Sequence, residues 1–120
     1  MLDFNKVFQT FRLMSKMSED VCMEYHDLIQ LCILEVERKI KPGVDIKANE
    51  SLLTQLAAAC SYYRYMIMTN MTSGTINALD LSVSIDNSKQ ILAAKRLRDE
   101  FVAMARNLLY DDTFLFGTIE

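Results

Sequence analysis

The fold is decided by residues 51–70, which read SLLTQLAAACSYYRYMIMTN. Arg64 is the only charged residue between Glu50 and Asp80, although 24% of the chain is charged. A stretch of this length with a single charge is typical of a helix that is buried on nearly all sides. We therefore expect a central helix here, with the rest of the chain packed around it.

The segment before the central helix predicts two amphipathic helices. Apolar residues recur every three or four positions between Asp3 and Met14, which indicates one face of a short helix. Ser18 is a suitable cap for a second helix, which ends at Pro42–Gly43. The apolar ladder of this second helix comprises Val21, Tyr25, Leu28, Ile29, Cys32, Ile33, Val36 and Ile40.

The pattern changes after the central helix, which we expect to break at Thr72–Gly74. Apolar and polar residues then alternate, and the apolar positions are Leu79, Leu81, Val83 and Ile85. This period of two predicts a β-strand with one buried face, which needs a pairing partner in this chain or in another copy. A last helix is expected over Lys89–Tyr110. Its apolar face comprises Ile91, Ala94, Leu97, Phe101, Met104 and Leu108.

Together these elements predict a mostly α fold in one domain, residues 1–120. We expect a compact bundle of about four helices, one short β-strand or extended segment before the last helix, and an extended apolar C-terminal tail over residues 111–120. The chain has 120 residues, of which 51% are hydrophobic, so it can form a core without disulfides or metal. The three cysteines fit buried thiols in a reducing cytoplasm, since none are at CxxC spacing.

Composition argues against two classes of partner. The net charge of −3 is unlike that of nucleic-acid binders, which are usually basic, so we expect no sequence-specific nucleic acid. The N-terminus lacks the basic and apolar regions of a signal peptide. Arg64 in the middle of the longest apolar segment disfavours insertion into a bilayer, so we expect no membrane association.

The sequence carries no catalytic pattern. His26 is the only histidine, and no nucleophile elbow, glycine-rich phosphate loop or cluster of metal ligands accompanies it. His26 and Cys60 are expected to be an exposed helical residue and a core residue, respectively. We therefore expect no enzyme activity, no catalytic residue, no metal and no cofactor.

Two features point to association instead. Arg64 needs partners for its donors, and it either reaches the surface between Tyr62 and Tyr65 or pairs with a carboxylate of a neighbouring subunit. The tail has four large apolar residues within its last seven, namely Phe114, Leu115, Phe116 and Ile119. These residues pack either on their own domain or on a partner, because soluble monomers avoid exposed apolar patches.

The order of these elements resembles a known family. A helix that ends at Pro42–Gly43 precedes a helix with the centre LAAACSYYRY (56–65). An alternating LSVS (81–84) and, after a long helix, LYDDTFLFG (109–117) follow. This arrangement is similar to the small head–tail connector (adaptor) proteins of tailed bacteriophages and prophages. The resemblance covers roughly residues 21–117, and its motifs are patterns of residue type rather than invariant residues.

The resemblance implies a virion structural protein whose subunits form a ring at the portal and join the head to tail-completion proteins. The implied partners are the portal protein, the tail-completion protein and further copies of this chain; a monomer in solution is compatible with it. The implied location is the cytoplasm of the bacterial host and then the head–tail junction of the virion. The implied portal-docking residues are Phe114, Leu115, Phe116 and Ile119, and the implied inter-subunit residues are Leu79, Leu81, Val83, Ile85 and Arg64.

The alternative function is a small helical regulatory or inhibitory protein that binds a single protein partner. Such a protein would form a one-to-one complex and no ring. Its gene would also lie outside a phage packaging operon, which separates the two hypotheses.

Overall fold

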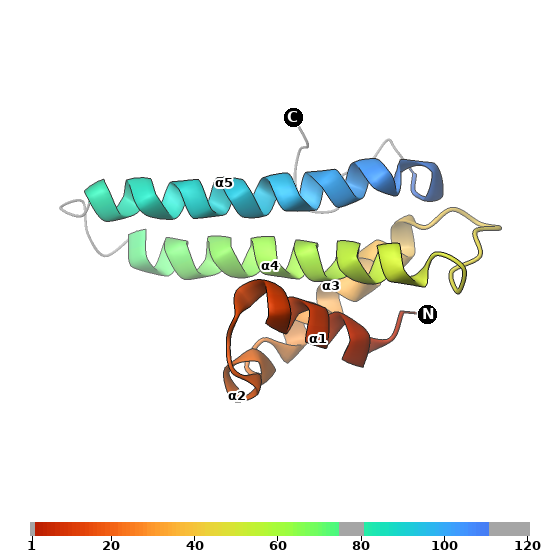
Figure 1. Cartoon of the computed structure of the whole chain (residues 1–120), viewed down its shortest axis with the longest axis horizontal. Coiled ribbons are helices and arrows are strands. Elements are labelled where there is room, and N and C mark those ends of the chain that lie inside the picture. Colours follow the sequence, from red (N-terminus) through yellow and green to blue (C-terminus); the bar gives the residue numbers. More distant parts are fainter. Residues whose placement is uncertain (1, 75–80, 111–120) are drawn as a thin grey trace.

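Helix α4 (Glu50–Gly74) is the central element of the fold. The structure is a computed structural model that describes residues 2–74 and 81–110. Helix α5 (Leu81–Met104) runs antiparallel along one side of α4, and α1 (Phe4–Ser15) and α3 (His26–Lys39) pack against other sides of it (Figure 1). The expected mostly helical, compact fold is therefore confirmed.

The burial of α4 follows from its sequence. Leu53, Leu56 and residues 57–61 are fully buried, and the small side chains at 57–60 allow neighbouring helices to approach closely. The one hydroxyl in this run is satisfied, because Ser61 Oγ donates to the carbonyl oxygen of Ala57 at 2.8 Å. The helix continues to Gly74, about one turn beyond the predicted end at Asn70.

The boundaries of α1 are set by local hydrogen bonds. The Asp3 carboxylate caps its start by accepting from the backbone N–H of Asn5 at 2.9 Å. At its end, Lys16 adopts a left-handed conformation with φ of 59° and donates its N–H to the carbonyl oxygen of Arg12. The buried side chains Val7, Phe8 and Phe11 form the predicted apolar face of this helix.

The predicted second helix is divided in two, which corrects the single helix expected from the sequence. Ser18 caps α2 (Glu19–Met23) as predicted, but the chain then turns at Glu24–Tyr25 before α3 begins. The turn shifts the buried face, so that Cys22 is buried and Val21 is exposed. The ring centroid of Tyr25 at this turn lies 4.9 Å from that of Tyr65 on α4. This tertiary contact stabilises the turn between α2 and α3.

The predicted strand is also wrong for its described part, because residues 81–85 form the first turns of α5. Leu79 and Asp80 lie outside the described residues. A lone strand would leave its backbone N–H and C=O groups unpaired, whereas a helix satisfies them internally and can pack along α4. The only β-pairing in the described residues is an isolated bridge between Ile40 and Leu109.

The last predicted helix differs at both ends. Helix α5 begins at Leu81 and ends at Met104, and a short 3₁₀ helix, η1 (Arg106–Leu108), follows it. The buried face is also shifted, since Met104 is exposed while Ala105 is fully buried. The core formed by these helices includes Val7, Phe8, Phe11, Cys22, Ile29, Cys32, Ile33, Val36, Leu53, Leu56, Ala57, Ala58, Cys60, Ala105 and Leu109.

Candidate interaction site

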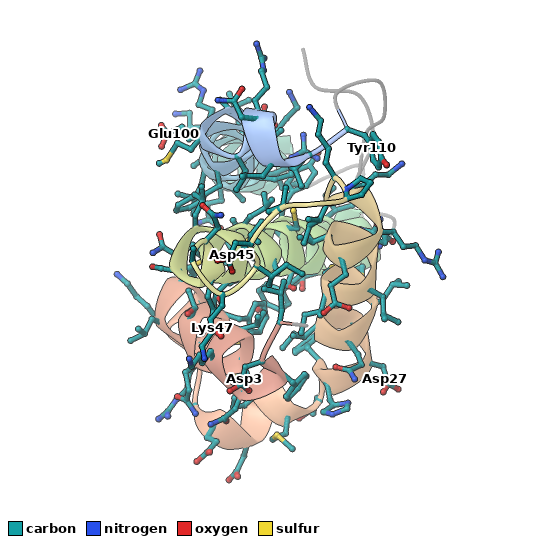
Figure 2. All side chains as sticks on the ribbon, turned by 90° about the vertical axis from the view of Figure 1, so that its right-hand side faces the viewer. Asp3, Asp27, Asp45, Lys47, Glu100 and Tyr110 are labelled. Atoms are coloured by element: carbon teal, nitrogen blue, oxygen red, sulfur yellow. The ribbon has the colours of Figure 1, made fainter. Side chains whose placement is uncertain are left out.

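The last described residues are anchored to the end of α3. The backbone N–H of Lys41 donates to the carbonyl oxygen of Leu108 at 2.8 Å, and the N–H of Tyr110 donates to that of Lys39 at 2.9 Å. Leu109 is buried between these two bonds, whereas Tyr110 is exposed. Figure 2 shows Tyr110 at the α3 end that lies opposite Asp27. The starting point of the C-terminal tail is therefore fixed on the surface of the bundle.

The predicted docking residues of the tail, Phe114, Leu115, Phe116 and Ile119, lie outside the described residues. Leu79, the first of the predicted inter-subunit residues, lies outside them as well. The others in that segment, Leu81, Val83 and Ile85, belong to α5, so any contact they make comes from a helix instead of a strand. Their role in docking and subunit contact stays a prediction.

Arg64 has a partner within the chain. Its two terminal nitrogens each lie 3.0 Å from one oxygen of the Glu35 carboxylate, which joins α4 to α3 in a forked ion pair. The two side chains are 27% and 22% exposed, so water screens the pair only in part. The guanidinium is therefore satisfied without a neighbouring subunit, and an inter-subunit role for Arg64 stays a prediction.

A second arginine is more deeply buried and was missed by the sequence patterns. Arg98 on α5 is 1% exposed, and its guanidinium carbon lies 4.6 Å from the ring centroid of Tyr63 on α4. Its Nε and Nη2 both donate to Oδ1 of Asp99, at 3.0 and 2.7 Å. The detectable signal was spacing, because Arg98 lies four residues after Ala94 on α5, on the same helical face as this buried residue.

The residues weighed for catalysis lie apart from one another. His26 is half-exposed at the start of α3, with its ring 4.4 Å from that of Phe4 and its Nδ1 3.4 Å from Asp27. Cys60 is fully buried in α4. No group of metal-ligating side chains occurs in residues 2–74 and 81–110. His26 and Cys60 are therefore not brought together in one site.

The buried thiols are kept protonated by their surroundings. Burial raises the pKa of Cys32 to about 11, and burial also raises the pKa of Cys60 well above its ordinary value of 9.0. Both belong to the core between α3 and α4. Since only the thiolate is an effective nucleophile, the raised pKa values lower the reactivity of both thiols.

These raised pKa values predict a loss of stability at alkaline pH. In the unfolded chain a thiol ionises near pH 9.0, whereas folded Cys32 keeps its proton to about pH 11. The folded state thus binds more protons in this window, so its free energy of unfolding falls as the pH rises through it. We expect urea titrations to show a smaller fall for Cys32→Val. An equal fall in both proteins would contradict the assignment.

A polar groove of about 420 Å³ lies between α1 and α4. Lys6 and Glu50 bridge it with an ion pair of 2.8 Å, and its other lining side chains are amides and hydroxyls. The hydroxyl oxygen of Thr54 is buried there and has no hydrogen-bond partner among the described residues. The groove therefore offers hydroxyl, amide and charged groups for polar contacts.

The comparisons with known proteins give no relative. No family model, no curated protein and no solved structure matches this chain. In the described part of the chain, no helix is both long and apolar enough to cross a bilayer.

Proposed function

We propose that this protein is a phage or prophage head–tail connector subunit that acts by association at the portal. The single observation that carries the proposal is the anchoring of Leu108–Tyr110 against the end of α3. This anchor gives an apolar C-terminal segment a fixed origin on a helical platform, which is what a docking tail requires. The sequence resemblance to connector proteins is the basis for proposing that this helical bundle is a connector subunit.

The charge and surface of the described bundle are consistent with such a role. Arg98, Cys32 and Cys60 are buried and contribute to packing. The described residues that line the groove between α1 and α4 include no nucleophile paired with a base. In this proposal the tail residues Phe114, Leu115, Phe116 and Ile119 dock on the portal, and the tail-completion protein binds the assembled ring. The finer parts of the proposal, including ring formation and virion location, are tested as follows.

Deleting residues 113–120 is expected to abolish binding to the portal protein encoded beside this gene. The remaining bundle should stay folded, because the core residues of the described part of the chain all precede Tyr110. Binding is measured by co-sedimentation with assembled portal, and folding by circular dichroism. A variant with Thr113→Ser serves as a matched control and should bind normally. Normal binding by the truncated protein would overturn the tail assignment.

The flanking genes provide an independent test of the identity. Genes for a terminase, portal and capsid upstream, with tail-completion genes downstream, would support the connector. A neighbourhood without phage structural genes would overturn it and favour the single-partner regulatory protein.

A further inference from the structure

The two ends of α3 present surfaces of opposite charge. The segment Ser18–Asp27 has four carboxylates and no Lys or Arg, and all four are exposed. We call this surface the acidic end. Its members are Glu19, Asp20, Glu24 and Asp27, with the exposed apolar side chains of Val21 and Met23.

The other surface is the basic end. The segment Arg38–Val44 has three cations and no carboxylate, and the bridge between Ile40 and Leu109 brings η1, which contributes Arg106, next to it. One exposed apolar side chain accompanies these charges, since Tyr110 is 44% exposed and its N–H donates to the carbonyl oxygen of Lys39. The members of the basic end are Arg38, Lys39, Lys41, Arg106 and Tyr110.

The two surfaces face away from each other. Helix α3 has 14 residues and is therefore about 20 Å long, and the acidic and basic ends lie at its opposite termini. Figure 2 shows this separation through the labelled residues Asp27 and Tyr110. A carboxylate of the acidic end therefore cannot pair with a cation of the basic end in the same molecule.

We propose that the acidic end of one copy docks on the basic end of the next copy. Each surface joins exposed apolar residues to charges of one sign, which is the composition of an association patch with a polar rim. Opposite signs on the two patches favour head-to-tail contact and disfavour like-to-like contact. A head-to-tail contact of this kind builds a ring if the rotation between copies closes, and a filament if it does not.

This interface rests on the proposed function, because it names the contact through which the connector subunits assemble. It places that contact on described residues at the two ends of α3, on α2 and on η1. The tail remains available for the portal. Self-assembly and portal binding are therefore separate properties of the chain and can fail separately.

The test uses two charge-reversed forms of the full chain. The first carries Asp20→Lys on α2 and Glu24→Lys in the turn after it, both exposed positions. The second carries Arg38→Glu and Arg106→Glu, both also exposed. A control carries Lys89→Glu and Arg96→Glu on α5, which gives the same net charge as the second variant. Circular dichroism and thermal melting verify that each variant is folded.

Sedimentation velocity measures self-association at protein concentrations up to about 1 mM, the range in which weak contacts are populated. We expect the natural chain and the control to associate at about 0.02 M salt and to dissociate at about 0.5 M salt. Each variant has one patch with its charge neutralised and should be monomeric alone. An equal mixture of the two should form dimers, because the unaltered acidic end of the second variant complements the unaltered basic end of the first. A monomeric natural chain at low salt, or a reversed variant that associates like the control, would overturn the proposal.

Crosslinking locates the contact directly. A carbodiimide joins carboxylates to lysine amines that touch, so an equal mixture of ¹⁴N- and ¹⁵N-labelled chains should give hybrid crosslinks between residues 19–27 and Lys39 or Lys41. Hybrid crosslinks at other positions only would overturn the interface. If the chain binds the portal but does not self-associate, the proposed interface is wrong and the proposed function stands. If the chain self-associates but does not bind the portal, the proposed function is wrong and the interface stands.

Discussion

Replacing Phe11 by alanine is expected to remove about 3–5 kcal/mol from the free energy of unfolding. Phe11 is fully buried, and its ring lies 6.0 Å from that of Tyr65 and 6.4 Å from that of Tyr25. The side chain thus joins α1, the turn before α3, and α4. Its removal leaves a cavity at the meeting point of three elements, where the surrounding structure cannot easily collapse.

Urea titration followed by circular dichroism measures this effect. Natural domains are stable by about 5–15 kcal/mol, so the expected loss is a large part of the total. Leu13→Ala is the matched control on the same helix, since Leu13 is 78% exposed and should change stability by less than about 0.5 kcal/mol. A loss below about 1 kcal/mol for Phe11→Ala would mean that this packing is wrong.

Replacing Arg98 by leucine is expected to cost about 1.5–3 kcal/mol, the range for hydrogen bonds to charged groups. The change leaves Asp99 without two donors and removes the cation from the face of Tyr63. Asp99 keeps one partner, because Lys95 Nζ lies 3.5 Å from its other oxygen, and this limits the loss. The fully buried position of the guanidinium makes the loss larger than for a surface charge.

Two further variants give this prediction its specificity. Arg98→Lys should restore little of the stability, because a single ammonium cannot reproduce two donors to Oδ1 of Asp99 together with a planar face over Tyr63. Arg96→Leu, two positions away and exposed, should change stability by less than about 0.5 kcal/mol. Equal losses for Arg96→Leu and Arg98→Leu would show that Arg98 contributes only as a surface charge.

The coarse architecture could be predicted because it depends on local patterns. The charge-poor stretch around Arg64 identified α4, and the three- and four-residue spacing identified α1 and most of α3. The cap at Ser18 was also read correctly from residue type, whereas α3 ends at Lys39, before the predicted stop at Pro42–Gly43, and Ile40 is extended. These signals act within a few residues of one another, so a single sequence contains them.

The errors arose where distant contacts decide the structure. The turn at Glu24–Tyr25 depends on the packing of Tyr25 against Tyr65, forty residues away in sequence. The alternation after Leu79 satisfied the strand pattern, but α4 provides a long surface for a helix and the described residues provide no strand to pair with. The burial of Arg98 depends on the ring of Tyr63 from another helix.

The candidate site was predictable only in part. The need of Arg64 for a carboxylate followed from its chemistry, but the identity of Glu35 required the fold. The opposite charges at the two ends of α3 are visible in the sequence as separate segments. The fold was needed to show that these segments lie at opposite ends of α3. The bridge between Ile40 and Leu109 brings η1, which contains Arg106, next to the end of α3 that precedes Lys41.

The central place of α4 has a consequence for the synthesis of this protein on the ribosome. Helices α1 and α3 emerge first, but each packs against α4, which follows them in the chain. Nascent chains that end before residue 50 therefore carry apolar faces with no surface to cover them. Such fragments expose apolar surface and are therefore natural targets for chaperones and proteases.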